Sequence, residues 1–305
     1  MLMKITILDG LFVNPGDLSW ECFDKYGEFK CYDRTPEEMI VERIGNSDAV
    51  FTNKCYLSRE ILEQCPNLKF LGVTATGYDK IDLDACRDLG IAFCNVPAYS
   101  TDAVAQHTFA LILELTNLVG KYSHAVKEGK WYESEDFTFF AGTLSLLAGK
   151  SLGIIGYGNI GKRVAQIAEA FGMTVNIFSR DREAAIKSDI VTLHCPLDEN
   201  NKGFINADFI SQMKDGAILI NTARGRLVNE ADLAEALKSG KLAAAGLDVL
   251  ADEPPVAPNE LIELPNVVVT PHAAWLPRET RAHLINVCEE NLKSWIDGGN
   301  LNRIV

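Results

Sequence analysis

The chain has 305 residues, which is more than one ordinary hydrophobic core supports and predicts two domains. Its 29 basic and 42 acidic residues give a net charge of −13, whereas a protein that binds nucleic acid needs a basic face. No apolar run approaches the roughly 18 residues of a membrane span, and the eight cysteines form no C-x-x-C pair or zinc-like cluster. These features argue against nucleic acid, membrane and metal as partners. With the charged N-terminus "MLMKITILDG" they predict a protein of the reducing cytoplasm.

The first part of the chain alternates strand-like and helix-like segments. A strand is expected in "KITIL", and three helix-then-strand units follow in residues 35–52, 57–74 and 82–97. Such alternation is typical of parallel sheets built from βαβ units. We therefore predict a small flavodoxin-like α/β domain over residues 1–97.

A long helical stretch follows in residues 99–131, with Thr101 as its expected N-cap. Apolar residues occupy nearly every face of this helix, which predicts that it is buried between domains or subunits. Strands are then expected in "SLGIIG", "DIVTLHCP", "GAILINTAR", "AAAGLDVL" and "NVVVTPH". These features predict a larger, doubly wound Rossmann-like domain over residues 98–277. After Pro277 one more helix has room to return, so residues 278–305 are assigned to the small domain.

The stretch "SLGIIGYGNIG" places glycines at 156, 158 and 161 in the pattern G-x-G-x-x-G. The pattern alone is weak, but here it follows an apolar strand and opens a helix. Gly156 would permit the tight turn, Gly158 the approach of backbone N–H groups to a pyrophosphate, and Gly161 close packing of the helix on the sheet. The N-terminus of that helix favours negative charge. We predict a dinucleotide site rather than a purely structural turn.

The end of the next strand indicates which dinucleotide binds. NAD sites usually place Asp or Glu about 20 residues after the glycines, for the ribose 2′-OH. Here that position falls on Ser179 and Arg180, with Arg182 nearby, and these side chains suit a 2′-phosphate. NADP(H) is therefore favoured. Asp181 keeps NAD(H) open, and a solvated charged turn is the structural alternative.

Candidate catalytic residues follow three later strands. Arg224 comes after "ILINTA", Glu253 after "GLDVLAD" and His272 after "VVVTP". Ligands of open α/β sheets bind at the carboxyl ends of the strands, where these three residues would meet. An arginine can hold a carboxylate, and a histidine beside a carboxylate can act as acid and base. Asp248, a fourth residue at this edge, can accept a hydrogen bond from a nicotinamide amide.

The combination of "GYGNIG", "NTARGRLV", "DEP" and "PHAAW" resembles the D-isomer-specific 2-hydroxyacid dehydrogenase family over essentially the whole chain. The resemblance implies that His272 is the acid/base, that Glu253 pairs with it and keeps it charged near neutral pH, and that Arg224 binds the carboxylate and keto oxygen. It also implies that residues 1–97 with 278–305 bind the substrate and that residues 98–277 bind the dinucleotide. Further cofactor contacts are implied for Asn159, Ile160, Cys195, Pro196, Thr222, Ala223 and Asp248.

The resemblance implies two further features. The substrate carboxylate would bind backbone amides of the loop at Ala75, Thr76 and Gly77 in "VTATGYDKID". The chain would form a homodimer through the dinucleotide-binding domain, joined by the helix near residues 101–120 and its extension.

The substrate is predicted from two short motifs. "PHAAW", with Trp275, and "TNK", at 52–54, are similar to the glycerate dehydrogenase and hydroxypyruvate reductase branch. An indole can close a pocket around a short keto acid, whereas a packed interface tryptophan is the structural alternative. We predict reduction of hydroxypyruvate or glyoxylate, or oxidation of D-glycerate.

Other functions stay open for the same residues. Another 2-hydroxy acid, such as D-lactate, is the alternative within the family. Corepressors similar to these dehydrogenases keep the fold and the triad but sense the dinucleotide, and this chain lacks their long flanks. Phosphonate- or phosphite-oxidising relatives also keep Arg, Glu and His, but Lys54 alone gives them thin support.

One segment departs from the expected pattern. Only nine residues, "RDREAAIKS", separate "NIFS" from "DIVTLHCP", where relatives place an edge strand and a short helix. A parallel crossover ordinarily needs about 10–12 residues or more. The link is therefore predicted to be taut, and a segment near 181–188 to be missing from the sequence or lost from the protein.

Overall fold

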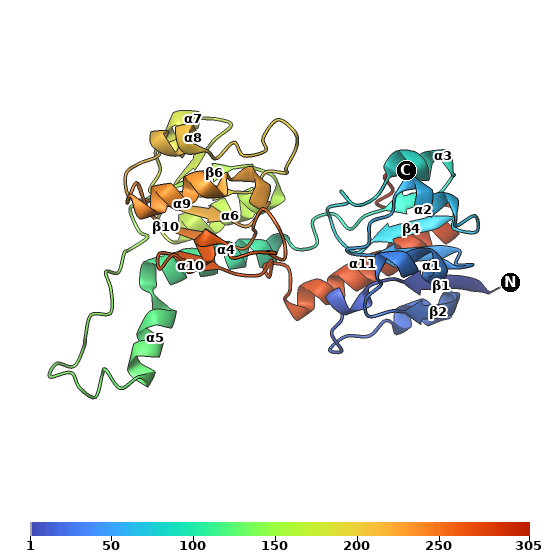
Figure 1. Cartoon of the computed structure of the whole chain (residues 1–305), viewed down its shortest axis with the longest axis horizontal. Helices are drawn as coiled ribbons and strands as arrows, with labels where there is room; N and C mark the ends of the chain where they lie inside the picture. The colour runs from blue at the N-terminus through green and yellow to red at the C-terminus, as the bar shows by residue number, and fades with distance from the viewer. Residues whose placement is uncertain (1) are drawn as a thin grey trace. The chain divides into compact units, whose positions relative to one another are not determined.

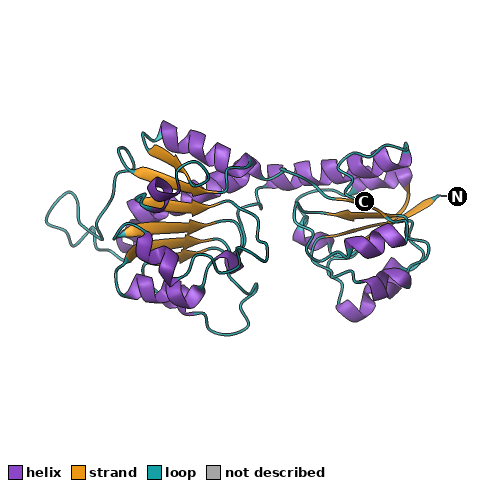
Figure 2. Ribbon diagram, turned by 90° about the horizontal axis from the view of Figure 1, so that it is seen from above, coloured by secondary structure: helices purple, strands orange, loops and turns teal. Residues whose placement is uncertain are grey.

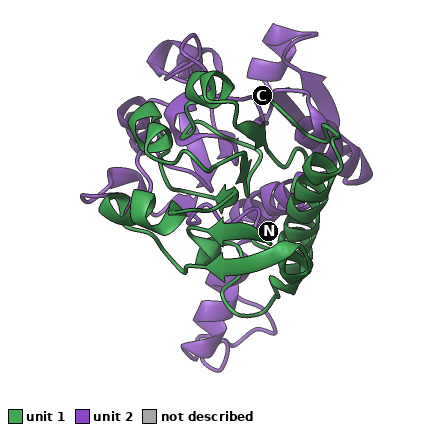
Figure 3. Ribbon diagram, turned by 90° about the vertical axis from the view of Figure 1, so that its right-hand side faces the viewer, with its two compact units in different colours: residues 1–100, 276–305 green, residues 101–275 purple. Residues whose placement is uncertain are grey.

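The computed structural model describes residues 2–305, which form two compact units (Figure 3). Unit 1 comprises residues 1–100 and 276–305, and unit 2 comprises residues 101–275. The division falls next to the predicted boundaries, and the assignment of substrate and dinucleotide to the two parts stays a prediction. Figure 2 shows helices on both faces of each sheet, which is the arrangement that parallel strands require.

Unit 1 contains a five-stranded parallel sheet in the order β2-β1-β3-β4-β5, the flavodoxin-like order. The strands are β1 (Met3–Ile7), β2 (Gly27–Cys31), β3 (Ala49–Thr52), β4 (Phe70–Val73) and β5 (Ala92–Cys94). Its helices are α1 (Ile40–Ile44), α2 (Arg59–Glu63), α3 (Leu83–Asp88) and α11 (Arg278–Ile296), with short 3₁₀ turns at Gly10–Phe12, Glu21–Tyr26 and Glu37–Met39. The sequence did not predict β2.

The returning helix α11 belongs to the core of unit 1 and packs on β4. The ring of Trp295 lies 5.4 Å from that of Phe70, which in turn lies 5.5 Å from Phe51. Phe23 extends this run of rings, 5.1 Å from Phe51. Burial of each such side chain stabilises the fold by about 1.5–3 kcal/mol, which is enough to fix the discontinuous segment to its sheet.

Unit 2 contains a six-stranded parallel sheet in the order β11-β10-β9-β8-β6-β7. The strands are β6 (Ser151–Ile155), β7 (Thr174–Ile177), β8 (Ile190–Leu193), β9 (Ala217–Asn221), β10 (Leu242–Leu247) and β11 (Val267–Val269). The helices are α4 (Thr101–Asn117), α5 (Val119–Lys127), α6 (Asn159–Ala170), α7 (Arg182–Ile186), α8 (Ala207–Gln212), α9 (Glu230–Lys238) and α10 (Glu260–Glu263), and a 3₁₀ turn lies at Gly225–Leu227. The predicted fold class, two parallel-sheet α/β domains, is confirmed.

The predicted long helix is divided at Leu118, whose φ of 50° is left-handed and ends the helical path. Helix α4 runs along the sheet and packs on β9, β10 and β11. It begins at Thr101, so that residue is the first of the helix rather than its N-cap. Helix α5 and the loop after it project from the rest of unit 2 (Figure 1).

The crossover between β7 and β8 contains one short helix that packs closely on the sheet. Strand β7 ends at Ile177 and β8 begins at Ile190, so twelve residues, 178–189, form the link rather than the nine counted from the sequence. They contain α7, which Asp181 caps by accepting a hydrogen bond from the N–H of Ala184 at 3.0 Å. A Cβ at Gly153 of β6 would lie 2.0 Å from the carbonyl oxygen of Ala185, so the helix backbone rests directly on the strand there. Strand β7 forms the edge of the sheet. Gly153 lets α7 lie close to the sheet, and the absence of a segment near 181–188 stays a prediction.

The described residues contain neither a membrane-spanning helix nor a disulfide bond. Within residues 2–305 no helix has the length and apolarity that crossing a membrane would require. All eight cysteines are free thiols.

Candidate active site

Parallel register brings three strand ends of unit 2 to one edge. Asn221 of β9 and Val269 of β11 both pair with Leu247 of β10, so the three strands end level. The backbone ladder continues one step further, because the N–H of Asp248 donates to the carbonyl of Asn221 at 2.9 Å. The loops that carry the predicted catalytic residues therefore start side by side.

His272 and Glu253 form a direct pair at this edge. Nδ1 of His272 lies 2.6 Å from Oε2 of Glu253, and each side chain is about one-third exposed, at 33% and 35%. Because a carboxylate only accepts, Nδ1 carries the proton and Nε2 is the ring atom left to exchange one. The other oxygen of Glu253 accepts the N–H of Leu250 at 3.0 Å, which fixes the carboxylate.

The backbone of His272 is left-handed, with φ of 52°. Pro271 ends the strand because it has no N–H. The N–H of His272 then turns to the carbonyl of Asp248 at 2.7 Å and that of Thr270 at 3.0 Å. The chain thus makes a sharp turn directly at the histidine.

Arg224 is half-buried in the neighbouring loop. Its Nη1 donates to its neighbour's carbonyl at Ala223, at 2.8 Å, which leaves most of its five N–H donors for a ligand. A Cβ at Gly225 would lie 1.9 Å from the carbonyl carbon of Leu250, so only glycine lets these two loops touch. Nε of Arg226 adds a hydrogen bond to the carbonyl of Ala251 at 3.0 Å. The loop of Arg224 is therefore packed against the loop that carries Glu253.

Asp248 is 1% exposed, and its carboxylate already has several partners. Oδ1 accepts from the hydroxyl of Thr270 at 2.6 Å and from the N–H of Ala273 at 2.7 Å, and Oδ2 accepts from the N–H of Ala274 at 3.0 Å. Burial alone would raise the pKa of this carboxyl, but hydrogen bonds from His107, Thr270 and the two amides outweigh it and lower the pKa. Asp248 is a carboxylate that shapes the loop of His272. Its predicted bond to a nicotinamide amide stays a prediction.

The glycine loop has the shape that a dinucleotide requires. Gly156 has φ of 98°, and a Cβ there would lie 2.4 Å from the N atom of Cys195. A Cβ at Gly161 would lie 2.1 Å from the carbonyl oxygen of Gly156, whereas one at Gly158 would meet no atom within 4 Å. Two glycines are thus needed for packing, and the third leaves open space at the N-terminus of α6. The residues present fit a pyrophosphate at that position.

The other predicted cofactor residues lie at this same edge of unit 2. Asn159 and Ile160 begin α6, Cys195 and Pro196 follow β8, and Thr222 and Ala223 follow β9. Ser179 and Arg180 are exposed just after β7, and the guanidinium of Arg180 lies 5.1 Å from the ring centre of Tyr157.

The predicted carboxylate loop lies in unit 1, after β4. The side chain of Thr76 donates to the carbonyl of Val96 at 2.7 Å, and Asn95 donates to the carbonyl of Thr76 at 2.8 Å. Within residues 2–305 the N–H groups of Ala75, Thr76 and Gly77 donate to no protein acceptor. The loop is held by its side chains and carbonyls, and its binding of a carboxylate stays a prediction. Trp275 is the half-buried last residue of unit 2.

The sequence matches one family over more than half of its length. Residues 109–274 match the model described as "D-isomer specific 2-hydroxyacid dehydrogenase, NAD binding domain". The chain belongs to this family. It is an oxidoreductase that acts on CH–OH donors and binds a nicotinamide dinucleotide, as predicted.

Similar proteins agree with this membership. A hydroxypyruvate reductase of Blautia hydrogenotrophica is 42% identical over 98% of this chain and 99% of its own. A glycerate dehydrogenase of Methylorubrum extorquens is 40% identical over 89% of this chain and 90% of its own. Among solved structures, an acyclic imino acid reductase in complex with NADPH and D-Arg has a TM-score of 0.86 and 31% identity, covering 99% of this chain and 100% of that one. The predicted branch, glycerate dehydrogenase and hydroxypyruvate reductase, is confirmed.

The first of these alignments also bears on the short crossover. It extends over 318 positions, more than the 305 residues of this chain, so the reductase has residues where this dehydrogenase has none. The link through α7 stays the predicted place of such a gap.

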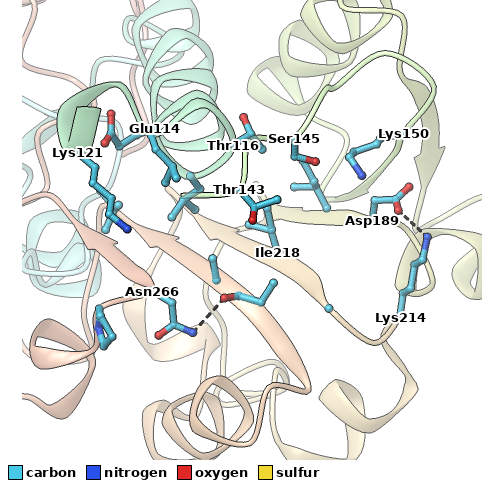
Figure 4. A pocket seen from close by; sticks show the side chains of 18 of the residues that line it. Glu114, Thr116, Lys121, Thr143, Ser145, Lys150, Asp189, Lys214, Ile218 and Asn266 are labelled. Atoms are coloured by element: carbon cyan, nitrogen blue, oxygen red, sulfur yellow. Dashed lines mark hydrogen bonds and ion pairs between the residues drawn. The ribbon is translucent and has the colours of Figure 1, made fainter. Parts of the chain in front are cut away.

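A cavity of about 600 Å³ lies at the opposite edge of the same sheet (Figure 4). Asp189, Gly216 and Asn266, which line it, each come directly before a strand. None of the predicted site residues lines it. The cavity is therefore separate from the dehydrogenase site.

Sequence reasoning missed one group at the site. His107 and Thr108 of α4 contact Thr270 and Thr222, which begin the loops of His272 and Arg224. The available signal was a histidine one helical turn from Val104 and Leu111, on an apolar face. Helical spacing alone does not say which strand such a residue faces.

Proposed function

We propose that this dehydrogenase reduces hydroxypyruvate or glyoxylate with NADPH, or oxidises D-glycerate in the reverse direction. The observation that carries the proposal is the pair of His272 and Glu253, 2.6 Å apart, on a sheet edge shared with Arg224 and the glycine loop. The similar proteins named hydroxypyruvate reductase and glycerate dehydrogenase support the choice of substrate.

The catalytic roles follow from the chemistry of the three side chains. A bound nicotinamide dinucleotide supplies the hydride. His272 delivers a proton from Nε2 to the carbonyl oxygen of the keto acid, while Glu253 holds Nδ1 and stabilises the charged ring. Arg224 binds the carboxylate through its paired N–H groups and polarises the keto oxygen.

Unit 1 supplies a carboxylate-binding group of its own. The three amides of Ala75, Thr76 and Gly77 are free to donate, and successive N–H groups of this kind form an anion-binding concavity. We propose that they bind the carboxylate of the substrate. Trp275 would limit the length of the substrate side chain and favour a short keto acid.

The preference for NADPH rests on the residues after β7. Ser179 and Arg180 are exposed there, and a hydroxyl with a guanidinium suits a 2′-phosphate. Asp181, which would serve the ribose of NAD, instead caps α7 through the N–H of Ala184. Because Asp181 already serves as a helix cap, Arg180 is the better candidate to bind the 2′-phosphate of NADPH.

The proposed homodimer forms through unit 2. The segment from α5 to residue 146 carries large hydrophobic side chains that are more than half exposed, an exposure typical of an interaction surface. These residues are Val119, Trp131, Tyr132, Phe137, Phe140, Leu144 and Leu146. Light scattering should show a dimer, and Phe137→Ser with Phe140→Ser should shift it towards monomer; a wild-type monomer would overturn the assembly.

Turnover tests the function. NADPH and NADH are compared with hydroxypyruvate, glyoxylate, pyruvate and a bulky 2-keto acid, and fastest oxidation of NADPH with hydroxypyruvate is expected. His272→Gln should lower kcat by about 10²–10⁴-fold while cofactor affinity is kept. A preference for NADH would overturn the role of Arg180. No turnover with any acid would overturn the enzyme assignment and favour a dinucleotide sensor.

A further inference from the structure

Two adjacent residues of α4 reach the loops of both Arg224 and His272. Nε2 of His107 lies 2.9 Å from the hydroxyl of Thr270 and 3.3 Å from Oδ1 of Asp248. The hydroxyl of Thr108 lies 3.0 Å from that of Thr222, two residues before Arg224. We propose that His107 and Thr108 are positioning residues that tie the two catalytic loops to one helix and so set the separation of Arg224 and His272. The proposal rests on the proposed function of those two side chains.

The proton positions follow from counting donors. Thr270 has one hydroxyl proton, and it goes to the carboxylate of Asp248 at 2.6 Å, which can only accept. The hydroxyl oxygen of Thr270 must then accept from His107, so Nε2 of His107 carries its proton. The chain of bonds runs from His107 through Thr270 to Asp248, whose oxygens hold the amides of Ala273 and Ala274.

The backbone at His272 needs this support. A left-handed conformation costs a residue other than glycine about 1–3 kcal/mol unless the surroundings hold it. Asp248 holds it through its carbonyl, which accepts the N–H of His272, and through its carboxylate, which accepts the next two amides. His107 is the only partner of Asp248 within residues 2–305 that comes from α4.

Helix α4 is close enough to serve as a common frame. A Cβ at Gly246 of β10 would lie 3.0 Å from Cβ of Leu111, one turn beyond His107, so the helix rests against the strand. Thr108 is fully buried, and its hydroxyl donates to the carbonyl of Val104 at 2.8 Å, which sets its rotamer and makes it the acceptor from Thr222. The side chain of Thr108 is therefore fixed before it meets the loop of Arg224.

The test compares His107→Leu, His107→Gln and wild type. The leucine removes the donor, so kcat should fall about 10–100-fold, as for a small misplacement of a catalytic group, while the Kd for NADPH stays within about threefold. Glutamine places an N–H near Nε2 and should restore kcat to within about threefold. If the leucine variant does not fold, His107→Asn, which is too short to reach Thr270, is measured in its place.

Thr108→Val tests the second contact, with Thr116→Val as the matched control. Thr116 is also buried on α4 and donates to the carbonyl four residues before it, but it contacts no catalytic loop. Thr108→Val should raise the KM for the keto acid about 3- to 30-fold, since Arg224 binds the carboxylate, and Thr116→Val should leave it unchanged. Equal effects of the two valines would overturn the role of Thr108.

Amide hydrogen exchange separates this proposal from the proposed function. In His107→Leu the amides of Ala273 and Ala274 should exchange at least about tenfold faster, with the strands of unit 2 unchanged. If wild type reduces no keto acid and this exchange still rises, the proposed function fails and the positioning stands. Unchanged exchange together with wild-type kcat in His107→Leu would overturn the positioning.

Discussion

Adding one methyl group at Gly158 should separate cofactor binding from folding. A Cβ there meets no atom within 4 Å, and the backbone, at φ −79° and ψ −155°, suits an ordinary residue. The loss of unfolded-state freedom and the weaker N-cap roughly cancel, so the stability of Gly158→Ala should lie within about 1 kcal/mol of wild type. The methyl would occupy the space proposed for the pyrophosphate, at a cost of about 1–3 kcal/mol. The Kd for NADPH should therefore rise roughly 5- to 150-fold.

The same change at Gly161 should have the opposite result. A Cβ there would lie 2.1 Å from the carbonyl oxygen of Gly156, whereas ordinary contacts begin at 3.4 Å. The helix or the turn must move by more than 1 Å, and such overpacking costs about 1–3 kcal/mol. For a unit of this size the melting temperature should fall by about 2–12 °C.

Thermal unfolding without cofactor and fluorescence titration with NADPH measure the two effects independently. A Gly158→Ala variant that binds NADPH as wild type does would refute the placement of the pyrophosphate at this loop. Equal loss of stability in both variants would refute the different roles of the two glycines.

Three further outcomes are expected. Gly153→Ala should lower the melting temperature by several degrees, about 2–4 °C for each kcal/mol, because its Cβ would lie 2.0 Å from the carbonyl oxygen of Ala185; a wild-type melting curve would contradict the close packing of α7. Burial lowers the pKa of His194 to about 3 from 6.5, so the unfolded state binds the proton more readily and stability falls as the pH drops below 6.5. Because His194 is partly exposed, the free energy of unfolding in urea should fall by only about 1–2 kcal/mol between roughly pH 7 and pH 5. The variant His194→Gln should lose most of this pH dependence. Glu253→Gln should lower kcat about 10–10³-fold in steady-state assays, because an amide does not stabilise the charged His272; an unchanged kcat would leave the pair a structural contact.

The edge that carries Arg224, Glu253 and His272 could be predicted because it follows from strand order alone. Each residue comes after an apolar strand, and parallel strands end together. Strand β2 (Gly27–Cys31) could not be predicted in this way. Its sequence "GEFKC" has no β-branched residue, and its strand conformation comes from pairing with β1.

The crossover through α7 shows where the physical reasoning was incomplete. The prediction counted nine residues between the strands, whereas β7 ends at Ile177 and β8 begins at Ile190, which leaves twelve. It also did not consider how closely the helix could approach the sheet. A glycine inside the strand "SLGII" is a signal of close backbone approach, and it was present in the sequence. Its partner, the carbonyl of Ala185, could be identified only from the folded chain.

Two separate groups hold His272, and they act on different parts of it. Glu253 contacts the ring and fixes which nitrogen carries the proton, whereas Asp248 contacts the backbone and fixes where the ring points. A hydrogen bond to a charged group contributes about 1.5–3 kcal/mol, so the two amide bonds to the carboxylate of Asp248 outweigh the cost of a left-handed residue. Because Glu253 holds the ring that exchanges the proton, loss of Glu253 should lower kcat more than it changes the Kd for the cofactor. Loss of the support behind Asp248 should lower kcat at every pH.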